Sequence, residues 1–185
     1  MPAFASRAAE QGEPRMANKS NFTPEEWGRI LSSPMVVAMA ITAADPGGFW
    51  GLLKESMSGG FAILEARQDG QANPLVKEVA QEFTTPEGRT ASRAALQSRF
   101  KGLNLDAMKD AAMTELQAVS AILDLKSPND APAFKSWLQE VAQKAAEAGT
   151  EGGFLGFGGV AVSEAEKTAL TEISGALKSG GVTTT

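Results

Sequence analysis

This chain of 185 residues has no histidine, cysteine or tyrosine, and so lacks the side chains most used for proton shuttling, thiol chemistry and transition-metal ligation. Its 43% hydrophobic and 21% charged residues indicate a globular fold, and its net charge of -5 disfavours a general affinity for nucleic acid or anionic lipid. Length and composition together predict one domain of a soluble, cytoplasmic protein.

The two ends of the chain differ in composition from its middle. Residues 1–20 are polar, mixed in charge and without the apolar run of a signal peptide, and Met16 offers a second start. We therefore expect a disordered N-terminal arm over 1–20, a single helical domain over 21–178 and a disordered tail over 179–185.

Helix-start signals follow the arm at short intervals. Thr23 and Glu26 flank Pro24 in the pattern of a capping box, which predicts a helix beginning there. Ser33-Pro34 is expected to open a second helix, with the run MVVAMAITAA, which is apolar on every side and so predicts burial. Asp45-Pro46 then restarts the chain, and apolar residues at helical spacing continue to Leu64.

The second half repeats these signals. Asn73-Pro74 and Thr85-Pro86 predict two more helix starts, and an apolar face predicts a long helix from Leu105 to Leu125, which Ser127-Pro128 would end. A further helix is expected over 132–148.

The helix over 132–148 carries its own capping and pairing signals. Glu140 and Lys144 are expected to pair at the i, i+4 spacing, and Gly149 is expected to cap the C-terminus. A second capping box, at Ser163 and Glu166, begins the last helix.

Amphipathic helices joined by proline-marked turns predict an all-α fold, an irregular multi-helix bundle of about seven or eight helices with a Gly/Phe-rich loop before the last helix. No membrane span is expected, because Ser33-Pro34 and Asp45-Pro46 interrupt the long apolar stretch that contains them.

The Gly/Phe-rich segment GTEGGFLGFGGVAV is the place where helix signals fail. Phe154, Leu155 and Phe157 are apolar among permissive glycines, so they either tuck back into the bundle or form a docking surface for a partner. The segment also fits a G-x-G-x-x-A pattern, but the strand and the directly following helix of a dinucleotide-binding turn are missing from the pattern.

Other groupings of side chains are weaker. Arg89 and Arg93, with Arg99 and Lys101 further on, could hold a phosphate group, although such charges more often form a solvated face. No hydrolase motif organises the serines and lysines. We therefore expect no enzyme, no catalytic residue, no metal and no cofactor.

Two functions of different classes fit this sequence. The first is an interaction or scaffold module that binds a protein partner or self-associates through Phe154, Leu155 and Phe157. The alternative is a bundle that holds a small apolar ligand near Trp50 and the methionines. A closed apolar cavity with a few converging polar groups would favour the ligand-binding bundle, and a filled core with a protruding Gly/Phe-rich loop would favour the scaffold.

Overall fold

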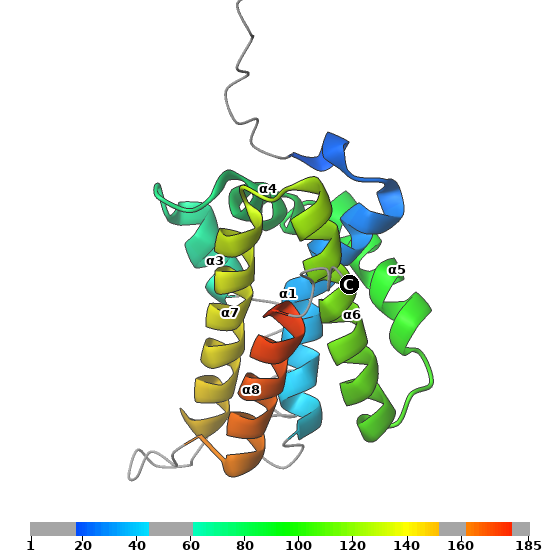
Figure 1. Ribbon diagram of the computed structural model, residues 1–185, viewed down its shortest axis with the longest axis vertical. Helices are drawn as coiled ribbons and strands as arrows, with labels where there is room; N and C mark the ends of the chain where they lie inside the picture. Colours follow the sequence, from blue (N-terminus) through cyan, green and yellow to red (C-terminus); the bar gives the residue numbers. More distant parts are fainter. Residues whose placement is uncertain (1–17, 45–60, 152–161, 179–185) are drawn as a thin grey trace, which may run out of the picture.

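The computed structural model describes residues 18–44, 61–151 and 162–178 (Figure 1). Over these residues the chain is helical and contains no strand, which confirms the predicted all-α fold for them. The expected total of helices and the Gly/Phe-rich loop extend into residues outside this description. The described elements are η1 (Lys19–Asn21), α1 (Pro24–Ala44), α3 (Phe61–Gln68), α4 (Pro74–Phe83), α5 (Pro86–Phe100), α6 (Leu105–Lys126), α7 (Ala131–Glu151) and α8 (Glu164–Lys178).

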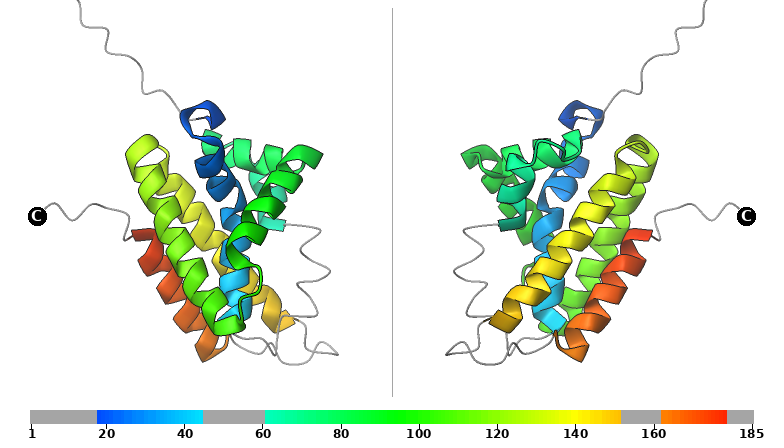
Figure 2. Two further views of the ribbon diagram at one scale, coloured as in Figure 1. Left: turned by 90° about the vertical axis from the view of Figure 1, so that its right-hand side faces the viewer. Right: turned by 90° about the vertical axis from the view of Figure 1, so that its left-hand side faces the viewer.

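Helix α1 lies at the centre of the bundle. It packs against α4, α5, α6, α7 and α8. Figure 2 shows α6 and α8 on one side of α1 and α3 and α4 on the other, with α7 crossing the bundle so that it contacts both groups. The apolar run of α1 explains this position, because Ile30, Leu31, Val36 and Val37 are completely buried and need neighbours around the helix.

The predicted boundary at Ser33-Pro34 is wrong, because α1 continues through Pro34. A proline has no N–H, so its presence leaves the carbonyl of Ile30 without the donor that a helix normally supplies. The Ser33 hydroxyl replaces that donor and donates to the Ile30 carbonyl oxygen at 2.7 Å. This local hydrogen bond and the burial of both residues allow one long helix where the sequence suggests two.

The predicted capping boxes are confirmed. The Thr23 amide donates to Glu26 Oε2 at 2.7 Å and the Glu26 amide donates to Thr23 Oγ1 at 3.3 Å. Ser163 and Glu166 make the same reciprocal pair at 2.8 and 3.2 Å. These caps fix where α1 and α8 enter the bundle.

The other helix boundaries follow the sequence with small differences. Asn73 and Thr85 cap α4 and α5 as expected. Gly149 does not end α7, which continues to Glu151, because a glycine costs a helix only about 1 kcal/mol relative to alanine. Leu105, expected on the inward face, is 39% exposed as the first residue of α6.

Residues 18–20, which belong to the predicted N-terminal arm, lie against the bundle. The η1 turn contains Lys19, whose amide donates to Glu78 Oε1 at 3.1 Å and whose ammonium donates to Glu82 at 2.5 Å. Residues 18–20 therefore pack with the helical domain, and both of these glutamates on α4 serve to attach them.

Among the described residues, α1 has the length and apolar character that crossing a membrane requires. Most of its apolar stretch is buried against other helices of the same chain. The core helix of a globular protein has the same length and apolar character, and α1 is surrounded by other helices as a core helix is.

Candidate functional site

The residues predicted to bind a partner, Phe154, Leu155 and Phe157, lie outside the described residues. The same is true of Trp50, the residue near which an apolar ligand is expected. A candidate site in the described part of the chain must therefore be built from other side chains.

The arginines proposed to hold a phosphate are not gathered into one site. Arg89 and Arg93 are exposed on α5, whereas Arg99 turns toward α6 and pairs with Glu115. Arg99 Nε lies 3.0 Å from Glu115 Oε1, an ion pair without hydrogen-bond geometry, and Arg29 on α1 donates to Glu115 Oε2. Glu25 completes this group with an ion pair of 3.3 Å to Arg29.

We call Glu25, Arg29, Arg99 and Glu115 the Glu115 cluster. Burial raises the pKa of the Glu115 carboxyl above its ordinary value, and this effect exceeds the opposing attraction of Arg99 and Arg29. Two carboxylates face two guanidinium groups, so the cluster carries no net charge. The cluster lies where α1, α5 and α6 meet, and its ion pairs link these three helices.

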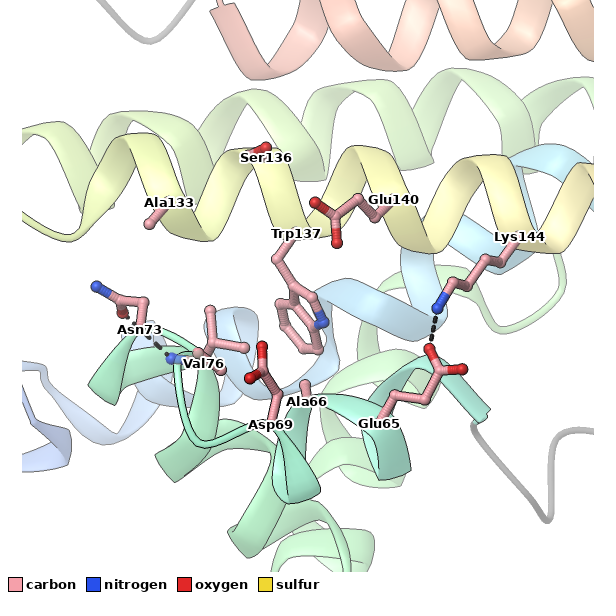
Figure 3. Close-up of a pocket in the computed structure, with 11 residues that line it drawn as sticks. Glu65, Ala66, Asp69, Asn73, Val76, Ala133, Ser136, Trp137, Glu140 and Lys144 are labelled. Atoms are coloured by element: carbon pink, nitrogen blue, oxygen red, sulfur yellow. Dashed lines mark hydrogen bonds and ion pairs between the residues drawn. The ribbon is translucent and has the colours of Figure 1, made fainter.

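A pocket of about 350 Å³ lies between α3, α4 and α7 (Figure 3). It opens at the surface, and its lining combines small apolar side chains with charged ones. We call it the acidic pocket, and it is lined by Glu65, Ala66, Asp69, Ala72, Asn73, Val76, Ala133, Ser136, Trp137, Glu140 and Lys144.

The turn between α3 and α4 shapes one side of the acidic pocket. Asp69 Oδ1 accepts a hydrogen bond from the Gln71 amide at 2.8 Å, and Asn73 Oδ1 accepts one from the Leu75 amide at 2.9 Å. The Asn73 side-chain amide also donates to Asp130 Oδ1 at 2.8 Å, which ties the start of α4 to the residue before α7. Local capping therefore holds two lining residues in place.

Trp137 extends from α7 toward α3, and Figure 3 shows its ring with Asp69 on one side and with Glu65 and Lys144 on the other. The residue is 7% exposed and packs edge-on against Phe134, with ring centroids 5.2 Å apart. Its indole nitrogen has no hydrogen-bond acceptor among the described residues. The nitrogen is itself shielded from solvent, and an unpaired buried donor costs about 1–3 kcal/mol.

The charges of the acidic pocket are unequal. Glu65, Asp69 and Glu140 bring three carboxylates to a lining that contains one ammonium group, that of Lys144. Lys144 pairs with Glu65 on α3 instead of the expected Glu140, because the fold brings α3 beside α7. Glu140 is exposed and has no ion-pair partner among the described residues.

The described residues contain no group of three or more acidic side chains arranged to hold a metal ion. The three carboxylates of the acidic pocket therefore do not form such a group. Such an arrangement suits an extended ligand that several side chains contact at once.

Sequence reasoning missed the acidic pocket, although it used some of its residues. Asn73 was interpreted as a helix cap and Glu140 with Lys144 as a surface pair, and both interpretations concern one helix at a time. The pocket depends on the contact of α3 and α7, which lie far apart in the chain. Comparisons with protein-family models, with curated proteins and with solved structures find no match to this chain.

Proposed function

We propose that this protein is a helical interaction module that docks a protein partner at the acidic pocket. The observation that carries the proposal is a surface pocket with unpaired polar groups around a buried tryptophan. Glu140 and Ser136 are exposed beside it, and neither makes a hydrogen bond to another described residue. Aromatic side chains at the centre of a polar surface are typical of binding hot spots.

The described core supports an interaction role over the enclosure of an apolar ligand. The large side chains Phe134, Leu116 and Ile173 are completely buried and fill the space between the helices. The acidic pocket is open and lined by carboxylates. An apolar ligand would remove water from these carboxylates without offering them hydrogen-bond partners, which is unfavourable. The pocket therefore suits a partner that itself carries polar groups.

A photo-crosslinking experiment tests this proposal. A benzophenone amino acid placed at Ser136, which is exposed at the pocket, should capture a partner in the native cell. The matched control is the same group at Ala121, which is exposed on α6 away from the pocket lining.

The pattern of capture decides between the alternatives. A product formed from Ser136 and not from Ala121 supports docking at the pocket, and a product of twice the chain mass identifies a second copy as the partner. Equal labelling from both positions, or none from Ser136, would contradict the proposal.

A further inference from the structure

The acidic pocket has more negative than positive charge, and this imbalance limits what it can bind. Three carboxylates and one ammonium line it, so an anionic ligand would meet like charge. The pair of Lys144 and Glu65 is also exposed, at 48% and 65% of the two side chains, and exposed pairs contribute about 0–1 kcal/mol. An incoming cation could therefore replace Lys144 at Glu65 at small cost.

Two further carboxylates are ready to accept a donor. Glu140 has no partner among the described residues, and the Asp69 carboxylate accepts a hydrogen bond from a backbone amide, that of Gln71. Charge-assisted hydrogen bonds from a cation to carboxylates are about twice as strong as neutral ones. The pocket thus offers acceptors in excess and lacks donors.

Trp137 provides an independent indication of a ligand. It is 7% exposed, it lines the pocket, and its indole N–H is unpaired among the described residues. An aromatic ring beside carboxylates favours a cation, because its face attracts positive charge.

Resting on the proposed function, we infer that the acidic pocket binds a lysine or arginine side chain of the protein partner. The ammonium or guanidinium group contacts Asp69 and Glu140, and the methylene stem covers the small apolar residues Ala66 and Ala133 beside the Trp137 ring. Such a ligand supplies the cation and the apolar surface that suit this lining.

Nuclear magnetic resonance of the indole N–H groups tests this inference directly. The chain has three tryptophans, and Trp137→Phe identifies the resonance that belongs to the pocket. The probes are N-acetyl-lysine methylamide, N-acetyl-arginine methylamide and the uncharged N-acetyl-norleucine methylamide. We expect the two cationic probes to shift the Trp137 resonance saturably, with a dissociation constant in the roughly millimolar range, and norleucine to leave it unchanged.

Charge-neutral variants assign the effect to named side chains. Asp69→Asn with Glu140→Gln should weaken binding of the cationic probes at least about tenfold, because both acceptors of the cation lose their charge. Glu87→Gln is the matched control, since Glu87 is an exposed carboxylate on α5 outside the pocket lining. The amide spectra of both variants show whether each remains folded.

Each outcome separates this inference from the proposed function. An equal shift with norleucine, no shift with any probe, or unchanged binding in the double variant would overturn the inference. If the group at Ser136 still captures a partner when the cation-binding result is negative, docking at the pocket is supported and binding of a lysine or arginine side chain there is not. If the cations bind and Ser136 captures nothing, the pocket serves free cationic molecules and the docking function fails.

Discussion

Two regions of the bundle gather carboxylates, the Glu115 cluster at the contact of α1, α5 and α6 and the acidic pocket between α3, α4 and α7. In the cluster, Glu115 is 6% exposed and lies between two arginines, so its charge is matched within the chain. In the pocket, Glu140 is exposed and has no partner among the described residues. Matched charges hold a fold together, whereas unmatched charges at an open pocket are available to a ligand.

The largest expected effect comes from breaking the cluster. Arg99→Met should lower the free energy of unfolding by about 2–3 kcal/mol at neutral pH, less than for a fully buried pair because Arg29 remains. Urea denaturation at pH 7 and pH 5 measures this. The loss should be smaller at the lower pH, because the raised pKa of Glu115 favours proton uptake as pH falls. Arg93→Met, on the exposed face of the same helix, should change stability by less than about 0.5 kcal/mol, and an equal loss there would contradict the account.

Two glutamates should respond to pH in opposite directions. Burial raises the pKa of Glu115, so its stabilising contribution is present below its ordinary pKa and is lost as pH rises through the raised value. The hydrogen bonds from Lys126 and Thr23 lower the pKa of Glu26, so its contribution is present above its ordinary pKa and is lost as pH falls through the lowered value.

Unfolding curves of Glu115→Gln and Glu26→Gln across acidic pH measure this difference. As pH falls, wild type should gain stability relative to the first variant and lose stability relative to the second. Slopes of the same sign for both variants would show that Glu115 is not desolvated as described.

The smallest effect is expected in the pocket. Glu140→Gln should change the free energy of unfolding by less than about 0.5 kcal/mol, because the carboxylate is exposed and unpaired among the described residues. Thermal unfolding of Glu140→Gln and of wild type under the same conditions measures this difference in stability. A loss as large as that of Arg99→Met would indicate a structural role for Glu140 and remove the contrast between the two regions.

Local signals predicted much of the fold. The capping boxes at Thr23 and Ser163 and the caps at Asn73 and Thr85 begin helices where the sequence places them, since each depends on residues three or fewer positions apart. The boundary predicted at Ser33-Pro34 is wrong because it also rests on a local signal alone. The hydroxyl that satisfies the Ile30 carbonyl can be read from the sequence, but the burial of Ser33 and Pro34 themselves depends on helices distant in the chain.

The candidate site could not be predicted in the same way. Lys144 pairs with Glu65, which is distant in sequence, and not with Glu140 one turn away. Pairing of this kind follows from how α3 and α7 meet, and no local spacing encodes that contact. The expectation of a docking surface at Phe154, Leu155 and Phe157 stays a prediction, because these residues lie outside the described part of the chain.

Carbodiimide coupling of N-acetyl-lysine methylamide tests the central claim most directly, because it joins an amine to the carboxylate that it occupies. Peptide mass spectrometry then reports the rate of labelling at each site. The account predicts that Asp69 or Glu140 is labelled several-fold faster than the exposed Glu87, and that high salt reduces this preference. Equal rates at Asp69, Glu140 and Glu87 would contradict it.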